Sequence, residues 1–421
     1  MGMDASAKAL LIAFTRETAA ALYVINRLKP ENLCFFLAEP AKSLVESAIQ
    51  PHVTQMPRRW DWIVTPNPES FTDSYRPLAQ TIPDLMRTWE VAPGELALDL
   101  SDATPAMAAA LMMIGSGWSS RLIGLGPAGG ESAKESDRLT LDGQERTWLQ
   151  SNPWDEMAGT ARRDGCDLFN SGSFEAAASL FRMIELRVSG GQKPLYHALA
   201  DVAEGYGAWE RFHYRQAWEK LKTAYKALEM ASLWGGPANL KSVLPGLKAN
   251  MGFLEKLVLD PNEVKEFLAL DLLAHARRHA EVAHDYEAAM LTLVRALEAF
   301  AQFQLFKQYK IKTWDVQPEL LPEALRETCR TCMLSDLDGK YKLSLHDQFR
   351  ALAGLGSSMG QTYLAQWPKM KPLLDAANHA VLGHGFETLK AERYQQLLDI
   401  VLKLTAVAET SLPRFPTMAL G

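Results

Sequence analysis

The sequence predicts an α/β domain at the N-terminus followed by a long region that is almost wholly helical. Two observations carry this prediction. Up to about residue 150, short and fully apolar runs alternate with helix-like segments, whereas beyond about residue 164 one amphipathic helical pattern follows another. At 421 residues, 48% of them hydrophobic, the chain has room for two or three domains with buried cores. Wholesale disorder is excluded.

Four apolar runs in the first hundred residues are expected to be buried strands. They span residues 9–14, 32–37, 62–64 and 95–100. A turn at 15–18 and a helix ending near Leu28 separate the first two. Because short, fully apolar strands that alternate with helices are covered on both faces, we expect a parallel, doubly wound sheet.

The remaining boundaries follow from composition. A polar segment, 126–146, and an expected connection, from Trp148 to about Asp164, lead from this domain into the helices. We therefore expect an α/β domain at 1–150, a helical connecting domain at 151–260 and a second helical domain at 261–421.

Two strand ends carry polar residues that suit a ligand, because ligands of doubly wound sheets bind beyond the carboxyl ends of strands. The candidate ligand-binding residues are Thr15, Arg16, Ser101, Asp102, Ala103 and Thr104. Hydroxyls and free backbone N–H groups at helix starts suit phosphate or nucleotide groups. The alternative is ordinary capping, since Ser, Asp and Thr followed by Pro commonly begin a helix.

The segment 98–107 resembles the Asp-x-Thr-Gly-Gly-Thr-Lys-x-Met segment of CARF domains, the sensor domains of type III CRISPR ancillary proteins. It keeps Asp99, Thr104 and Met107. It departs from that pattern at Ser101, Asp102, Ala103 and Pro105. Pro105 stands where the family has Lys, so a cation is missing from the site that the resemblance implies, and the ligand's identity stays open.

The segment 375–386, Asp-Ala-Ala-Asn-His-Ala-Val-Leu-Gly-His-Gly-Phe, resembles the active-site segment of HEPN ribonucleases of prokaryotic defence systems. That segment has an Arg, usually followed by Asn, then an apolar half-turn and a His followed by Gly. Asn378, His384 and Gly385 are in register, and Ala377 occupies the Arg position. Seven residues make about two helical turns, so we expect positions 377 and 384 to share one helix face.

The chemistry of RNA cleavage explains why such a pair is needed. Without a metal, the 2′-hydroxyl of RNA attacks the adjacent phosphorus, and a His can move the protons. A guanidinium holds the phosphate and offsets the charge of the transition state, which Ala377 cannot do. Asn378 can donate a hydrogen bond but carries no charge. A His before a Gly is also common at helix ends for structural reasons alone.

Residues 271–278 and 285–298 look like the helical region that precedes the HEPN active site in CARF–HEPN ribonucleases of type III CRISPR systems. With the two segments above, in the same order, this resemblance spans most of the chain. It implies a Rossmann-like CARF sensor domain (1–150), a helical connecting domain (151–260) and a HEPN domain (261–421). It also implies a homodimer in which a cyclic oligoadenylate activates the cutting of single-stranded RNA. Cyclic tetra-adenylate is the first candidate for this activator and cyclic hexa-adenylate the second.

The leading hypothesis is therefore a signal-gated endoribonuclease with His384 as acid–base residue, Asn378 as its neighbour and Ala377 marking an absent phosphate clamp. Ala377 is either a deliberate substitution that silences a toxic enzyme or a natural residue of a protein that only senses or scaffolds. The second hypothesis is thus a silent cyclic-oligoadenylate sensor. A third is that the sensor domain cleaves its own activator.

The charge of the chain bears on whether it binds nucleic acids. A net charge of −6 argues against a general nucleic-acid coat protein. A local basic segment, 339–372, fits either an RNA groove or a solvated surface. Its charged residues are Lys340, Lys342, Arg350, Lys369 and Lys371 against Asp347.

Cysteines and targeting signals complete the expectations. Four cysteines make no disulfide framework in so long a chain. Cys329 and Cys332 form a single CxxC, which is a weak zinc or redox signal, so we expect buried or incidental thiols and no metal or other cofactor. The start shows no signal-peptide pattern, and the longest apolar stretch, 106–117, is too short to span a bilayer. We expect a cytoplasmic protein.

Overall fold

The structure is a computed structural model that describes residues 7–128, 135–259 and 266–420. The first six residues, which belong to the start where no signal peptide is expected, and part of the polar segment 126–146 lie outside the described residues. The chain divides into two compact units. The N-terminal unit contains residues 1–164 and 179–197, and the C-terminal unit contains residues 165–178 and 198–420.

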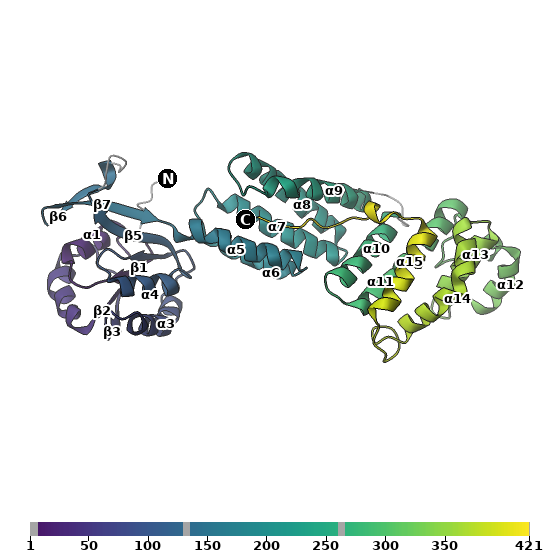
Figure 1. The fold of residues 1–421 in the computed structure, drawn as a ribbon, viewed down its shortest axis with the longest axis horizontal. Helices are drawn as coiled ribbons and strands as arrows, with labels where there is room; N and C mark the ends of the chain where they lie inside the picture. The colour runs from purple at the N-terminus through teal and green to yellow at the C-terminus, as the bar shows by residue number, and fades with distance from the viewer. Residues whose placement is uncertain (1–6, 129–134, 260–265, 421) are drawn as a thin grey trace. The chain divides into compact units, whose positions relative to one another are not determined.

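A seven-stranded sheet forms the centre of the N-terminal unit, in the order β3-β2-β1-β4-β5-β7-β6 (Figure 1). Its strands are β1 (Ala9–Ala13), β2 (Asn32–Ala38), β3 (Arg59–Thr65), β4 (Leu96–Asp99), β5 (Ser119–Pro127), β6 (Arg138–Leu141) and β7 (Gln144–Ser151). The strands β1 to β5 pair in parallel, and β7 pairs antiparallel with both β5 and β6. The four predicted strands and the doubly wound sheet are confirmed.

Helices cover both faces of the parallel strands, which explains why these strands are apolar throughout. Successive side chains of a strand point to opposite faces. Leu10 and Phe35 pack with α1 (Thr18–Leu28) on one face. Leu11 and Phe36 pack with α3 (Phe71–Thr88) and α4 (Pro105–Gly115) on the other. All five residues of β1 are buried.

The expected connection at 148–164 is wrong. Its first residues belong to β7, and the rest belong to the helix α5 (Pro153–Asn170). The strand is fixed by Trp148, which is buried and packs edge-to-face on Tyr23 of α1 at a centroid distance of 5.9 Å. A two-residue turn, Asp142-Gly143, joins β6 to β7 with φ angles of 49° and 76°. An Asp-Gly pair between two strands is typical of a tight hairpin, and the polar flanks concealed it.

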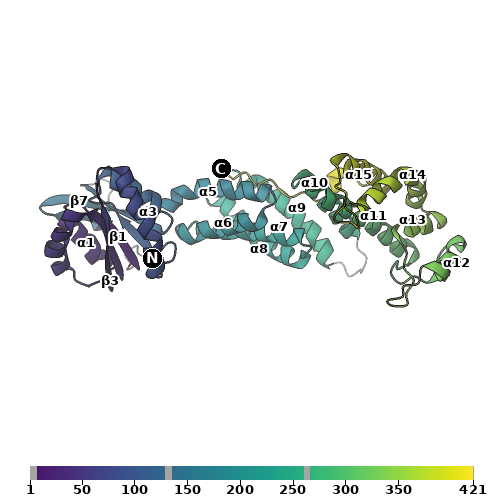
Figure 2. The same cartoon turned by 90° about the horizontal axis from the view of Figure 1, so that it is seen from below.

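The predicted helical region is confirmed. Its helices are α5, α6 (Phe174–Arg187), α7 (Lys193–Glu210), α8 (Tyr214–Leu233), α9 (Leu240–Leu259), α10 (Glu266–Glu281), α11 (Tyr286–Tyr309), α12 (Glu323–Cys332), α13 (Leu345–Gly354), α14 (Ser358–Asn378) and α15 (Ala391–Thr405). Figure 2 shows α10 to α15 grouped together within the C-terminal unit. None of the described helices is long and apolar enough to cross a membrane.

One apolar core joins α10, α11, α13, α14 and α15. The helices α13 and α14 touch backbone to backbone, because a Cβ added to Gly360 would lie 2.3 Å from the nitrogen of Ala353. Further along α14, Met370 and Leu374 are buried in the same core. This packing fixes the C-terminal end of α14, which carries the candidate catalytic segment.

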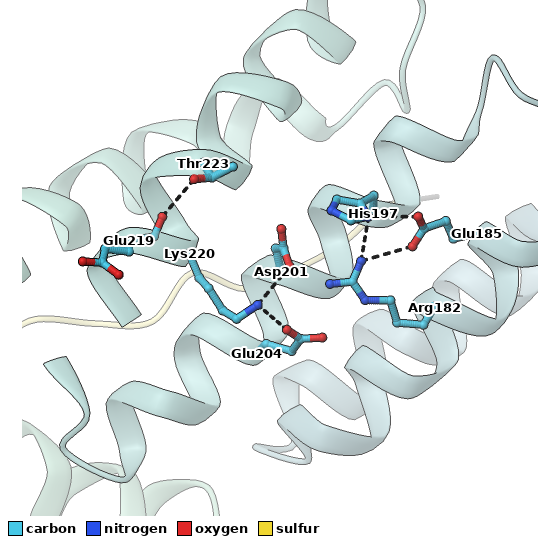
Figure 3. Close-up of polar contacts among 8 residues, drawn as sticks. All are labelled: Arg182, Glu185, His197, Asp201, Glu204, Glu219, Lys220 and Thr223. Atoms are coloured by element: carbon cyan, nitrogen blue, oxygen red, sulfur yellow. Dashed lines mark hydrogen bonds and ion pairs between the residues drawn. The ribbon is translucent and has the colours of Figure 1, made fainter. Parts of the chain in front are cut away.

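Surface ion pairs connect neighbouring helices within each unit (Figure 3). In the C-terminal unit, Lys220 of α8 contacts Glu204 and, at 3.2 Å, Asp201 of α7. In the N-terminal unit, Glu185 of α6 contacts Nδ1 of His197 of α7 at 2.9 Å. Such pairs contribute little to stability when they are partly exposed to solvent, so we assign them an orienting role.

Candidate functional site

The candidate catalytic residues do not share one helix face. Helix α14 ends at Asn378, and His384 lies in the loop of residues 379–390, which we call the His384 loop. The expectation of a common face is therefore wrong. The helix stops because the chain turns back on itself directly after Asn378, as the hydrogen bonds of the loop show.

Backbone hydrogen bonds fold the His384 loop back onto the end of α14. The N–H of His384 donates to the carbonyl of Asn378 at 2.7 Å. The N–H groups of Gly383 and Gly385 both donate to the carbonyl of Ala380, at 2.9 and 3.1 Å. Carbonyls at a helix end that lack partners within the helix are thereby satisfied. The fold thus returns His384 to Asn378 by a tight loop instead of by helical periodicity.

Glycine is required on both sides of His384. A Cβ on Gly383 would lie 2.4 Å from the carbonyl oxygen of Ala377, and a Cβ on Gly385 would lie 2.1 Å from that of His379. Real Cβ atoms do not approach backbone oxygen so closely. The Gly-His-Gly sequence was the signal for this loop, and the helical interpretation overlooked it.

The three candidate catalytic residues differ in exposure. Ala377 is only 2% exposed and belongs to the apolar core, whereas Asn378 and His384 are exposed. The loop also carries Phe386, which is 97% exposed, near the exposed Val381 and Leu382. An imidazole and an amide are therefore open to solvent, next to a position that holds a buried methyl group.

Most of the basic segment 339–372 is neutralised. Three of its cations pair with acids: Lys340 with Asp315 at 3.2 Å, Lys342 with Asp338 at 2.9 Å and Arg350 with Asp347 at 3.1 Å. Lys369 and Lys371 of α14 are exposed and make no ion pair with any described residue. The basic segment thus retains two lysines without an ion pair among the described residues.

The CxxC pair does not form a metal site with other described residues. Cys329 is buried and Cys332 is exposed, and both are free thiols on α12. Burial is the main cause that raises the pKa of the Cys329 thiol. Among the described residues, no group of three or more His, Cys, Asp or Glu side chains could hold a metal ion.

The candidate sensor loops meet where the strand order reverses, between β1 and β4. The carboxylate of Asp102, after β4, accepts hydrogen bonds from the backbone N–H groups of Thr15 (2.7 Å), Arg16 (2.6 Å) and Glu17 (2.8 Å). It also accepts one from the hydroxyl of Thr15 at 2.6 Å. We call these contacts the Asp102 clamp. The clamp uses the free N–H groups that were expected to suit a ligand.

The other residues after β4 are engaged locally. Ser101 donates its hydroxyl to Asp99 at 2.5 Å, and burial raises the pKa of the Asp99 carboxyl to about 6. Thr104 accepts from the N–H of Met107 at 3.2 Å and so caps α4, as the capping alternative predicted. Ala103 contributes only its backbone and a partly buried methyl group.

Comparison with known proteins identifies two domains in the helical region. The family model of the Csm6 6H domain matches residues 158–254, and that of the Csm6 HEPN domain matches residues 261–408. Together they cover more than half of the chain. No curated protein sequence matches.

One solved structure shares its fold with nearly all of the chain. Csm6 from Enterococcus italicus bound to cyclic hexa-2′-fluoro-hexa-dAMP is 12% identical, with a TM-score of 0.56 over 96% of each chain. A type III CRISPR defence DNA nuclease activated by cyclic oligoadenylate is 14% identical over 47% of this chain and 34% of that one. Its TM-score of 0.24 is too low for a structural argument. From the two domain models and the common fold, we conclude that the chain belongs to the Csm6-type CARF–HEPN family of CRISPR ancillary proteins.

Proposed function

We propose that this protein is a cytoplasmic, cyclic-oligoadenylate-gated endoribonuclease of a type III CRISPR system whose catalytic pair is incomplete in the present chain. One observation carries the proposal: the His384 loop returns the backbone of His384 to the end of α14 and leaves its imidazole exposed, while residue 377 of α14 is a buried Ala. Family membership supports the ribonuclease class.

The proposed reaction needs no metal. His384 takes the proton of the 2′-hydroxyl as that oxygen attacks phosphorus, and a protonated imidazole returns a proton to the leaving 5′-oxygen. Asn378 donates a hydrogen bond to a non-bridging phosphate oxygen. Ala377 offers no charge to the transition state, so we expect the chain to be nearly silent.

We propose that the active form is a homodimer. The exposed Val381, Leu382 and Phe386 lie in the His384 loop itself. Large apolar side chains that are exposed together indicate an interaction surface. A second copy seated on this surface would bring two His384 loops together into one composite pocket for single-stranded RNA.

We propose that the activator binds beside β1 and β4, with Thr15, Arg16, Ser101, Asp102, Ala103 and Thr104 as its surroundings. The site lies at the switch point of the doubly wound sheet, where such folds bind ligands. We retain tetra-adenylate as the first candidate. The analogue bound to the Enterococcus relative contains six nucleotides, which supports hexa-adenylate as the second candidate.

The test is RNA cleavage by the chain and by its Ala377→Arg variant, with and without each cyclic oligoadenylate. Cleavage that appears only in the variant and only with activator supports the gated ribonuclease. A second candidate function is a silent sensor, which is favoured by the burial of Ala377 in the apolar core. It predicts activator binding without cleavage by either protein. Loss of the activator itself during incubation would instead indicate self-cleavage in the sensor domain.

A further inference from the structure

A cavity in the C-terminal unit lies apart from both candidate sites. It has a volume of about 460 Å³ and is enclosed by the loop between α5 and α6, by α10 and by the segment after α15. All the residues that line it belong to one compact unit. Pockets that hold small organic molecules have volumes of about 300–1,000 Å³, so the size is suitable.

The wall formed by the C-terminal segment is firmly held. The Asn170 side chain donates to the carbonyl of Met418 at 2.7 Å and accepts from its N–H at 2.8 Å. The amide of Asn250 donates to the carbonyl of Arg414 at 2.9 Å. Phe415 packs on aromatic rings of α7 at centroid distances of 4.4 and 5.1 Å. Hydrogen bonds and aromatic packing thus fix the C-terminal segment as one wall of the cavity.

Arg278 of α10 lines this cavity and carries a buried donor without a partner. Its Nε and Nη2 donate to the two carboxylate oxygens of Glu210, at 2.7 and 3.3 Å. Its guanidinium lies 4.1 Å from the ring centre of Phe415. The remaining nitrogen, Nη1, is buried and has no hydrogen-bond partner among the described residues. A guanidinium carries five N–H donors, and a buried donor left unpaired is unfavourable.

The charges around the cavity leave room for an anion. Burial alone would raise the pKa of Glu210, but the hydrogen bond from His275 and the charge of Arg278 lower it to about 2. Burial and the charge of His275 lower the pKa of His279, so that ring is neutral near pH 7. Of the three arginines in the lining, Arg277 pairs with Glu281 and Glu409, and Arg278 pairs with Glu210 and lies 3.8 Å from Asp271. Arg414 makes no ion pair with a described residue. Arginine outnumbers glutamate on this lining.

We propose that the cavity binds a small organic anion. Its phosphate or carboxylate accepts hydrogen bonds from Nη1 of Arg278, and its apolar body packs against Phe174 and Phe415. Arg suits this role because its planar fork can serve Glu210 along one edge and a second anion along the other. The cavity lining comes from the region matched by the 6H model, the region matched by the HEPN model and the tail beyond both. An occupant therefore ties these three segments together.

The experiment is calorimetric titration of the full chain with adenosine 5′-monophosphate, inorganic phosphate and adenosine. Val282→Trp fills the cavity without removing any of its polar groups, because Val282 lines it and is partly exposed. Leu186→Trp is the matched control, since Leu186 is an exposed apolar residue outside the cavity lining. We expect the monophosphate to bind, Val282→Trp to abolish that binding and Leu186→Trp to leave it unchanged.

A second variant isolates the guanidinium. Arg278→Lys keeps a positive charge beside Glu210 but removes Nη1, and we expect it to weaken binding about tenfold, the loss of one charge-assisted contact. If that variant fails to fold, Val282→Trp still decides. The proposal is overturned if neither anion binds at millimolar concentration, if Val282→Trp binds as well as the unmodified chain, or if adenosine binds as tightly as its monophosphate.

Discussion

Restoring a cation at position 377 is the most direct test of the catalytic proposal. In the Ala377→Arg variant the guanidinium starts from the penultimate residue of α14, whose neighbour Asn378 is exposed. Removing one charge-stabilising donor from an active site typically costs about 10²–10³ in rate, so the variant is expected to gain that factor. The gain should require a cyclic oligoadenylate and should survive EDTA.

The same substitution carries a stability cost that can be estimated. Ala377 is 2% exposed, and forcing a larger side chain into a packed core costs about 1–3 kcal/mol unless the charged end reaches solvent. Ala376→Arg is the matched control, because Ala376 is 4% exposed and lies one residue away on a different face of the helix. It should destabilise the protein similarly and gain no activity.

The assay is cleavage of a labelled single-stranded RNA with analysis of the product ends, which should carry 2′,3′-cyclic phosphate. Adding His384→Ala to Ala377→Arg should abolish the gain, because the two residues act as one unit. The reasoning is refuted if Ala377→Arg stays inactive while it folds, dimerises and binds activator normally. Equal activity in Ala376→Arg would refute it as well.

Four further predictions test other parts of the structure. Gly383→Ala in the Ala377→Arg background should lose the rescued activity but keep activator binding, because its Cβ would lie 2.4 Å from a backbone oxygen; Gly190→Ala, whose Cβ meets nothing within 4 Å, is the control. Asp102→Asn should destabilise the N-terminal unit by about 1–3 kcal/mol, since it weakens charge-assisted hydrogen bonds, and should tighten activator binding in calorimetry, since it removes a carboxylate that repels phosphate. An unchanged affinity would contradict the second part. Phe386→Asp should shift sedimentation toward the monomer, and a fully dimeric variant would exclude the His384 loop from the interface. The pKa of the Glu210 carboxyl is about 2, below its ordinary value of 4.5. The ionised carboxylate therefore stabilises the folded state by about 3 kcal/mol above pH 4.5, and this contribution is lost as the pH falls through 2. The difference in melting temperature between Glu210→Gln and the unmodified chain should shrink over that range.

Local sequence was sufficient for four of the parallel strands and for the helical region. The strands β1, β2, β3 and β4 were predictable because a strand buried on both faces must be apolar throughout, a property that can be read without knowledge of its partners. The helical region was predictable for the same kind of reason, since helical periodicity is a local pattern. The hairpin of β6 and β7 was missed because its strands are largely polar, although the Asp142-Gly143 pair carried a signal.

The candidate catalytic segment was found from residue types in order, but its geometry was not. Helical spacing placed residues 377 and 384 on one face, whereas the chain leaves the helix at Asn378 and returns through a tight loop. Whether a helix continues beyond Asn378 depends on what the loop packs against. Gly383 and Gly385 permit the close backbone approach that ends it.

By itself the sequence determined a doubly wound sheet, a helical region and the order of the candidate motifs, because each depends on neighbouring residues. Only the tertiary structure decided which polar groups remain available. It brought Asp102 to the N–H groups of residues 15–17 and left Nη1 of Arg278 unpaired beside a cavity. It also paired Lys340 of the basic segment with Asp315, 25 residues away. Partners of this kind are mostly far apart along the chain, so no local pattern records them.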